Sequence, residues 1–384
     1  MPEKYDVAII GAGVIGCSIA YYLCQRDINN IAIIEKEHFP GTGSTSKAFG
    51  GIRAQFTTEA NISMSLLTMK LLVDMDEEMA SQSGYLKTGY LFVTANPKRF
   101  EQLQQNIRFQ RQFGVAVEPI SRDEIATRFP YFRSDDILGG SFGARDGFID
   151  PGGLTNAFYS RALSMGATML SDTSVIGLLK SDKGISGVVT DRGEIIADIV
   201  VNAAGSHAAG IASYAGVEVP VHPIRSNIAV SGPTPELPRV IPMTVDIDTG
   251  LLIRREGEGV GYAWTNPDEP TGLDSRFDSG FIELIAPKIE DRFPNLIDAG
   301  INFSKCWAGL YPETPDHHAI LGESGASGFM LAVGFGGHGI MHGPAAGKVM
   351  SELITTGKTE SVDISPFSFE RFKTGKLNLE QAVF

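Results

Sequence analysis

Little cysteine, no excess of basic charge and no long uninterrupted apolar run mark this sequence of 384 residues. Its three cysteines, Cys17, Cys24 and Cys306, form no CxxC pair, which argues against a disulfide framework or an iron–sulfur site and fits a reducing cytoplasm. The net charge is −13 and no basic run exceeds two residues, so nucleic acid is not an expected partner. Residues 8–23 are apolar, but three glycines interrupt them and they are too short to span a bilayer, so no transmembrane segment is expected.

A metal-ligand pattern is also lacking. His338 and His342 have a spacing at which two helical imidazoles can share zinc. No glutamate lies between them, and Gly336, Gly337 and Gly339 place His338 in a turn rather than inside a helix. We therefore expect no metal site. The glycines indicate a backbone that comes close to something flat or charged.

The N-terminal part of the chain carries glycines at a defined spacing. Residues 5–10 read as a buried strand, and Gly11, Gly13 and Gly16 follow in GxGxxG before a helix predicted over about 14–26. Gly11 permits a tight turn, Gly13 lets a pyrophosphate approach the backbone, and Gly16 lets the helix pack on the strand. The N-terminus of the helix would then face the phosphate charge.

A second predicted strand, NIAIIEKE, carries Glu35 at its end, 19 residues after Gly16. A carboxylate at this position accepts the hydrogen bonds of a ribose diol and repels a 2′-phosphate. Strand, glycines, helix, second strand and acid together favour a dinucleotide site over a ligand-free glycine turn. They do not separate NAD from FAD.

The next segments favour FAD. The loop GTGSTSKAFGGIR contains Ser44, Thr45 and Ser46, which can cap a helix and bind a second set of phosphates or a ribityl chain. An NAD enzyme would have little use for this loop because its ligand ends sooner. Residues 185–197 read as a hairpin leading into a buried strand over 197–205 that ends in small residues. Those small residues would let an adenosine approach, or would serve only a close helix–strand contact.

Seven motifs in this order and spacing resemble the D-amino-acid oxidase-like FAD family over nearly the whole chain. They are GAGVIG, Glu35, GSTSKAFGGIR, DGFIDP, NAAG, WAGLYPETPD and GFGGHG. Within the family, the sequence looks most like the beta subunits of dye-linked L-proline dehydrogenase and of heterotetrameric sarcosine oxidase. The segments LKTGYLFVT and NIRFQRQFGV also resemble that subgroup.

The resemblance implies an α/β fold, with a discontinuous Rossmann-type FAD-binding domain and an inserted α+β substrate domain built on an antiparallel sheet. The polar, helical character of residues 98–113 agrees with an insertion between apolar strands. Asp150 and Pro151 look like an N-cap and first residue of a helix that re-enters the first domain. The expected bounds are 1–84, 145–219 and 315–384 for the FAD domain, and 85–144 and 220–314 for the substrate domain.

The resemblance also implies the cofactor contacts. The loop at GFGGHG would meet the pyrimidine edge of the flavin, and its backbone amides would stabilise negative charge on the reduced ring. His338 would lie at the flavin edge, and His342 would be structural. The expected contacts with FAD are Gly11, Gly13, Val14, Ile15, Gly16, Glu35, Lys36, Ser44, Thr45, Ser46, Lys47, Gly51, Ile52, Val175, Ala204, Gly205, Gly337, His338, Gly339 and Ile340.

Covalent attachment of the flavin is not expected. Lys47 stands where dimethylglycine dehydrogenase has its attachment histidine, and Gly309 stands where monomeric sarcosine oxidase has its attachment cysteine. The nearby Cys306 is expected to be buried and inert.

On the substrate side, Arg53 aligns with the family arginine that pairs with a substrate carboxylate, and arginine suits a bidentate carboxylate pairing. The alternative is an arginine packed under the FAD phosphates or on the surface. Tyr311 aligns with an arginine of glycine oxidase and could hydrogen-bond the substrate. Met341 replaces a carboxylate-binding lysine of monomeric sarcosine oxidase, which would suit a substrate with hydrocarbon bulk, or it is plain core.

The predicted reaction is oxidation of a secondary amino acid, proline or a sarcosine-like compound, to the imine by hydride transfer to flavin N5. Oxidases that the chain resembles hold a lysine above the flavin, and the resemblance places the corresponding strand region at residues 245–264, which contain no lysine. At most one of Arg254 and Arg255 can point at the ring, because consecutive residues of a strand face opposite sides. Electrons would therefore pass to a dye, a quinone or a partner subunit in a hetero-oligomer. The alternatives are an oxygen-using oxidase and a subunit that holds FAD without catalysis.

Overall fold

A computed structural model describes residues 3–79 and 83–382 of the chain. The strands of its first sheet are β1 Glu3–Ile10, β2 Ile31–Ile34, β8 Thr168–Leu170, β9 Val175–Ser181, β10 Gly184–Thr190, β11 Gly193–Asn202, β17 Ile320–Glu323 and β18 Phe329–Val333. Their order is β17-β18-β11-β1-β2-β8, and the β9–β10 hairpin joins through β10 to β11. From β18 to β8 the strands run parallel, which is the arrangement expected of a Rossmann-type domain.

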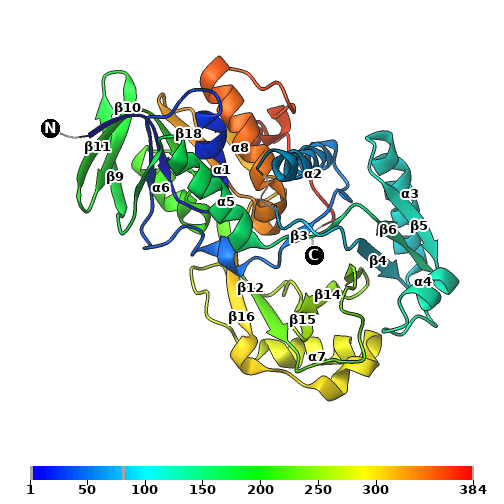
Figure 1. Ribbon diagram of the computed structural model, residues 1–384. Helices are drawn as coiled ribbons and strands as arrows, with labels where there is room; N and C mark the ends of the chain where they lie inside the picture. The colour runs from blue at the N-terminus through cyan, green and yellow to red at the C-terminus, as the bar shows by residue number, and fades with distance from the viewer. Residues whose placement is uncertain (1–2, 80–82, 383–384) are drawn as a thin grey trace.

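Three helices pack together beside this sheet: α1 Val14–Cys24, α5 Pro151–Ser164 and α8 Gly339–Thr356 (Figure 1). Contact between α1 and α8 depends on small residues, because a β-carbon on Gly347 would lie 2.6 Å from the carbonyl carbon of Ser18. The helix predicted to reach residue 26 ends at Cys24, because the chain soon turns at Asp27, whose φ of 63° is incompatible with a right-handed helix.

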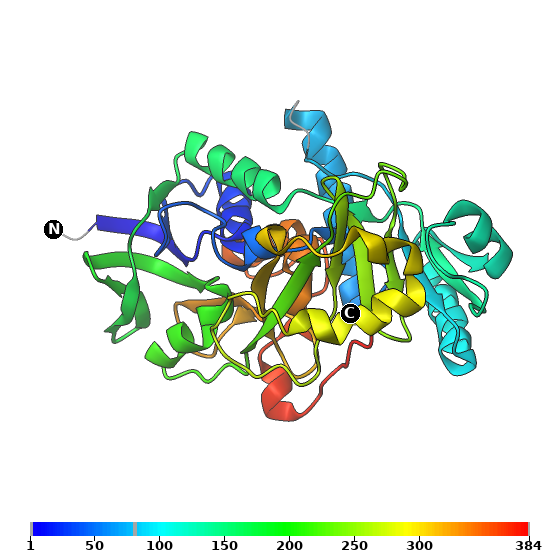
Figure 2. The same ribbon diagram turned by 90° about the horizontal axis from the view of Figure 1, so that it is seen from below.

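The second sheet is built from β4 Tyr90–Thr94, β5 Val117–Ser121, β6 Gly139–Gly143, β12 His222–Val230, β13 Met243–Asp246, β14 Leu251–Glu256, β15 Gly259–Ala263 and β16 Trp307–Glu313. Its order is β16-β12-β15-β14-β13-β4-β6-β5. Neighbouring strands are antiparallel except for β13 and β4, which are parallel. The helices α3 Pro97–Gln112, α4 Arg122–Arg128 and α7 Phe281–Arg292 belong to this half, and the two sheets lie side by side in both views (Figures 1 and 2).

Two local predictions are confirmed. The polar helix expected over 98–113 is α3, which Asn96 caps by accepting hydrogen bonds from the amides of Lys98 and Arg99. The start of α5 is also as expected, since the Asp150 carboxylate accepts from the Gly152 amide at 3.0 Å and Pro151 is the first helical residue.

The two halves meet at a small junction. There β3 Gly51–Ile52 pairs with β7 Gly147–Phe148, and α2 Glu59–Met79 lies against α8. Elsewhere the chain forms α6 Ala208–Tyr214, α9 Glu370–Thr374 and the 3₁₀ turns η1 Ser44–Lys47, η2 Gly205–His207, η3 Pro294–Ala299, η4 Phe303–Lys305, η5 Gly336–His338 and η6 Ser365–Phe367.

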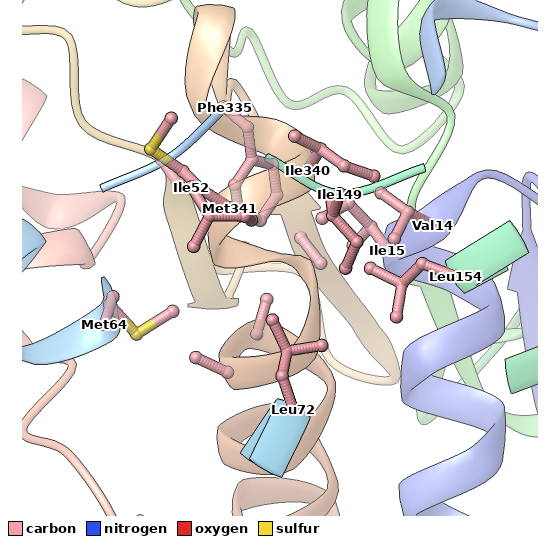
Figure 3. Packing of buried hydrophobic residues seen from close by; sticks show 14 of the residues in the cluster. Val14, Ile15, Ile52, Met64, Leu72, Ile149, Leu154, Phe335, Ile340 and Met341 are labelled. Carbon is pink, nitrogen blue, oxygen red and sulfur yellow. The ribbon is translucent and has the colours of Figure 1, made fainter. Parts of the chain in front are cut away.

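The main hydrophobic core runs across this junction. It includes Val14 of α1 and Met341 of α8, together with Phe92 and Met243 of the second sheet. Figure 3 shows its centre, where Met341 lies next to Ile52. The continuous core holds the two sheets together, and the exact domain bounds stay a prediction. No helix among the described residues is long and apolar enough to cross a membrane.

Candidate functional site

The glycine loop after β1 has the geometry that the GxGxxG spacing predicts. Gly11 has a φ of 104°, and a β-carbon there would lie 2.6 Å from the Ala203 carbonyl oxygen. A β-carbon on Gly16 would collide with the Gly11 carbonyl. Gly13 is the N-cap of α1 and provides no side-chain cap, and the first turn contains no acidic residue. The positive end of α1 is therefore free of its own anion and suits a phosphate.

Glu35 lies directly after β2, which is shorter than the predicted strand because the chain bends away after Ile34. One carboxylate oxygen accepts from the Ala12 amide at 2.8 Å and the other from the Glu37 amide at 3.0 Å. Glu35 is half-buried beside the glycine loop. Its position fits the predicted contact with a ribose.

The hydroxyl-rich loop supports α1 rather than capping its own short turn. The Thr45 hydroxyl accepts from the Val14 amide at 3.2 Å, whereas η1 begins without a side-chain cap. The Ser46 hydroxyl donates to the Thr42 carbonyl at 3.0 Å. The prediction that these hydroxyls cap a helix thus holds for Thr45 on α1. The reason is tertiary, because the folded chain brings residue 45 next to residue 14.

Open space beside the backbone fits an FAD molecule. A β-carbon on Gly43 or Gly205 would meet no atom within 4 Å, and the hydroxyls of Ser44 and Ser206 lie 3.4 Å apart. Gly205 and Ala204 follow β11 as predicted. The Lys36 ammonium lies 3.2 Å from His207 Nε2. Val175 begins β9, and the amide of Thr173, two residues earlier, donates to the Glu35 carbonyl. A helix N-terminus without an acidic residue suits a pyrophosphate, the nearby carboxylate can accept from a ribose, and the uncrowded glycines leave room, which together fit FAD.

The two positions considered for covalent attachment lie next to each other. A β-carbon on Gly309 would be 2.7 Å from Cβ of Lys47, and Trp307 Nε1 donates to the Lys47 carbonyl at 2.9 Å. Cys306 is only half-buried, so its expected burial is wrong; it lies between the end of η4 and the start of β16. Burial still raises the pKa of its thiol, which also contacts the Asn302 carbonyl.

The glycine run before α8 forms a turn, as predicted. Gly336 has a φ of 52°, and a β-carbon there would lie 2.6 Å from the Glu313 carboxylate. A β-carbon on Gly337 would lie 3.0 Å from the Tyr311 ring. The first turn of α8, which begins with Gly339 and Ile340, has no acidic residue and no side-chain cap. Its positive end is therefore available to an anionic group.

His338 differs from the prediction in one respect. Its amide already donates to the Phe335 carbonyl at 2.8 Å, because the glycines close a 3₁₀ turn there. Its buried ring lies edge-on to Phe56, with centroids 4.9 Å apart. Burial and then the charge of Arg53 lower the pKa of His338 well below its ordinary value, so the ring is neutral.

His342 is held inside the structure. Its Nε2 lies 3.0 Å from the Ser65 hydroxyl, and burial lowers its pKa to about 3. Both histidines therefore lie in a buried cluster. Among the described residues, no group of three or more His, Cys, Asp or Glu side chains could hold a metal ion.

Arg53 follows β3 directly, and it is only 3% exposed. Its guanidinium donates to the carbonyls of Gln55 and Ala382, each at 2.5 Å, and its Cζ lies 4.0 Å from the centroid of the Phe56 ring. Arg53 is therefore not on the surface. The Tyr90 ring, 6.0 Å from Cζ, adds a phenol that sequence reasoning missed, and burial raises the pKa of that phenol to about 12.

Asp146 is a second residue that sequence reasoning missed, although it begins the DGFIDP motif. Its carboxylate accepts from the Ala54 amide at 3.1 Å and from Gln55 Nε2 at 2.8 Å. Burial raises the pKa of Asp146 to about 7, against the opposing effects of those hydrogen bonds and of Arg53. Asp146 fixes the segment that carries Arg53.

The other two predicted substrate residues come from different halves of the molecule, Tyr311 from β16 and Met341 from α8. Tyr311, on β16, is half-buried next to Gly337, and burial raises the pKa of its phenol. Met341 is 5% exposed and packs in the main core beside Ile52 (Figure 3). Its environment matches the core-packing alternative.

A cavity of about 610 Å³ lies between α3, the second sheet and the C-terminal segment. Its wall includes Gln55, Phe92, Asp248, Trp264 and Ala382. Since Gln55 and Ala382 both bind Arg53, the cavity ends next to the guanidinium.

The neighbouring arginines of β14 point to opposite sides, as strand geometry predicts. Arg254 lies between the rings of Phe49 and Phe148, at 4.5 and 4.3 Å, and pairs with Glu256 at 2.5 Å. Arg255 instead binds Thr234. Burial lowers the pKa of Arg254 to about 10. Only Arg254 therefore faces the cofactor loop.

The glycine loop, Glu35 and the parallel sheet define a protein that binds a dinucleotide cofactor. The chain belongs to the family described as FAD dependent oxidoreductase, whose model matches residues 6–353. This confirms the predicted resemblance and the predicted fold, and it makes the protein an FAD-dependent enzyme.

The alignments with related proteins cover nearly the whole chain. FAD-dependent oxidoreductase domain-containing protein 1 of Xenopus laevis is 29% identical, and the alignment covers 100% of this chain and 85% of that protein. Mitochondrial sarcosine dehydrogenase of Mus musculus is 26% identical over 97% of this chain and 42% of its own length. L-proline dehydrogenase from P. horikoshii superposes with a TM-score of 0.91 at 30% identity, covering 98% of this chain and 100% of that one. Glycine oxidase from Geobacillus kaustophilus, with a TM-score of 0.84 at 24% identity over 96% of this chain and 99% of that one, supports the fold alone.

Proposed function

We propose that the protein oxidises a secondary amino acid, L-proline or a sarcosine-like compound, to the corresponding imine. The observation that carries this proposal is the buried guanidinium of Arg53, whose hydrogen-bond partners Gln55 and Ala382 line the cavity. A buried arginine held against neutral carbonyls gains most from a ligand that brings a carboxylate. The likeness to L-proline dehydrogenase supports a secondary amine beside that carboxylate.

The cofactor in this proposal is non-covalent FAD. Gly11, Gly13 and the first turn of α1 would hold its pyrophosphate, and Glu35 would hold the adenosine ribose. When bound, FAD supplies the acceptor for the hydride that leaves the carbon next to the substrate amine. The free N-terminus of α8 would stabilise the negative charge that develops beside Gly339 and Ile340.

The residues around Arg53 position the substrate rather than take a proton from it. His338 and His342 are buried and neutral, so they add no charge that would repel a protonated amine or compete for the carboxylate. Tyr90 and Tyr311 keep their phenol protons because burial raises their pKa values, so they can donate hydrogen bonds to the substrate. The amine must therefore reach the site in its neutral form, and turnover should rise with pH as the amine deprotonates.

We further propose that the electrons pass to a dye, a quinone or a partner subunit rather than directly to oxygen. Residues 245–264 offer no lysine, and the charge of Arg254 is already engaged by Glu256 and by two aromatic rings. A positive charge that is paired in this way stabilises a developing superoxide less than a free ammonium would.

The experiment compares L-proline with pyrrolidine, which lacks the carboxyl group, in a dye-reduction assay of Arg53→Ala. The KM for proline should rise on the order of 10- to 100-fold, because a charge-assisted hydrogen-bond pair is lost, while the KM for pyrrolidine should change little. Arg255→Ala is the matched control, because it removes an arginine of β14 that binds Thr234 instead of the Ala382 carbonyl. Equal losses for both substrates in Arg53→Ala would show that Arg53 supports the fold and does not bind the carboxylate.

A further inference from the structure

The C-terminal segment returns to the centre of the molecule. After α9 the chain turns at Gly375, which has a φ of 68°, and residues 376–382 run from the outside of the first half to the junction (Figures 1 and 2). This segment has no regular secondary structure. Its place must therefore be fixed by particular side-chain contacts.

Glu380 fixes the segment. It is 1% exposed, and its Oε1 accepts from the amide and hydroxyl of Thr57 at 2.9 and 2.5 Å. Its Oε2 accepts from the Thr58 hydroxyl at 2.8 Å and from Asn61 Nδ2 at 3.1 Å. These donors precede or begin α2, so one carboxylate joins the end of the chain to the start of that helix. The Glu380 amide adds a bond to the Asp316 carbonyl at 3.1 Å.

Two residues further on, the segment reaches Arg53. The amide of Ala382 donates to Glu380 Oε1 at 3.0 Å, which orients the peptide, and the carbonyl of Ala382 accepts from Arg53 Nη2 at 2.5 Å. Gln381 and Ala382 both line the cavity. The segment therefore stands between the cavity and the guanidinium that we take as the carboxylate anchor.

We propose that residues 378–382 are part of the substrate-binding site, and that the Ala382 carbonyl holds the place of the substrate carboxylate on Arg53 until the substrate displaces it. This inference rests on the proposed function, because it takes Arg53 as the anchor. A carbonyl offers one neutral acceptor oxygen, whereas a carboxylate offers two oxygens and a full negative charge to the same guanidinium N–H groups of Arg53. Entry of a carboxylate thus exchanges a weaker partner for a stronger one and moves the segment aside.

The test measures acetate binding to the oxidised, FAD-loaded protein through the change in flavin absorbance. The first variant ends at Leu377, and the second is full-length Glu380→Gln, which weakens the bonds to Thr57 and Thr58 without shortening the chain. Without the competing carbonyl, the Kd for acetate should fall about tenfold in the shortened chain and by a smaller factor in Glu380→Gln. Acetamide, which has the same shape without the charge, should bind the shortened chain as it binds the native one.

Glu370→Gln is the matched control, because Glu370 is a carboxylate of the same C-terminal region that pairs with Lys373 on the surface. Its acetate Kd should equal that of the native chain. If both variants bind acetate no more tightly than the native chain, or if acetate binds none of them, the proposal is wrong. If the shortened chain loses FAD, Glu380→Gln alone decides.

The proposed function is judged separately by reduction with secondary amino acids. If proline reduces the bound flavin, but the variants bind acetate with the same Kd as the native chain, only the inference about residues 378–382 is overturned. Tighter acetate binding in a chain that no amino acid reduces overturns only the proposed function.

Discussion

The carboxylate of Glu35 accepts from two backbone amides beside the glycine loop, so its charge is already oriented before a cofactor binds. Glu35→Ala should weaken FAD binding by roughly 1.5–3 kcal/mol, the value of hydrogen bonds to a charged group, and leave the fold intact. Equilibrium dialysis of the apoprotein against FAD measures this. Glu37→Ala is the control, because it removes an exposed carboxylate of the same turn and leaves the Glu37 amide in place.

An unchanged FAD dissociation constant in Glu35→Ala, with Glu37→Ala equally unaffected, would contradict the ribose assignment.

Asp146 gives the site a dependence on pH. Burial raises its pKa from 3.8 to about 7, so the folded state keeps a proton that the unfolded chain loses earlier. Its contribution to stability is therefore full below the unfolded value and is lost as the pH rises through the folded value. Asp146→Asn should be more stable relative to the native chain at about pH 8 than at about pH 5.

Urea unfolding of both chains at the two pH values gives this difference, in which the other titrating groups cancel. A difference that stays constant, or that grows towards low pH, would show that Asp146 is ionised in the folded protein.

Residues in the glycine loop could be predicted from the sequence because their roles follow from local spacing. Two neighbours of Arg53, the Tyr90 ring and the Ala382 carbonyl, could not be predicted, because neither is near Arg53 in the chain. The Ala382 carbonyl is 329 positions from Arg53, and only the fold brings the two together. The resemblance predicts that the amide of His338 faces the flavin, but in the structure this amide donates to the Phe335 carbonyl within the turn that its neighbouring glycines form.

At the scale of secondary-structure elements, close packing of α1 on α8 sets the position of both positive helix ends. A β-carbon on Gly347 would overlap Ser18, including its carbonyl carbon at 2.6 Å. Gly347→Ala should lower the free energy of unfolding by about 1–3 kcal/mol, because the helices must separate to admit it. Chemical denaturation of the apoprotein measures the change.

Gly210→Ala is the matched control in α6, where a β-carbon would meet no atom within 4 Å. Alanine is a better helix former than glycine, so this variant should equal or exceed the native stability. If Gly347→Ala is as stable as Gly210→Ala, the contact between α1 and α8 is looser than described.

The elements differ in how far the sequence defines them. The strand, helix and hairpin assignments rest on local periodicity and hold, with ends displaced where a turn intervenes, as at Asp27. The parallel pairing of β13 with β4 could not be predicted, because it joins residues about 150 positions apart inside a sheet expected to be antiparallel. The two strands pair because the order of the strands in the whole sheet makes β13 and β4 neighbours.

At the scale of the whole molecule, the sequence predicted the family and the fold because the motifs extend over nearly the full chain, and the matched family confirms both. The substrate could not be fixed in the same way. The cavity that leads to Arg53 is built from α3, the second sheet and the C-terminal segment, which come together only in the folded chain.

The central claim is that a secondary amino acid reduces the bound flavin. An anaerobic titration of the purified, FAD-loaded chain tests it most directly, with L-proline, sarcosine, glycine and pyrrolidine as the ligands and the flavin absorbance as the signal. L-proline or sarcosine should bleach the flavin at lower concentration than glycine, which lacks the second N-substituent, and than pyrrolidine, which lacks the carboxylate for Arg53. A flavin that stays oxidised with every secondary amino acid, while the chain retains its full complement of FAD, would contradict the account.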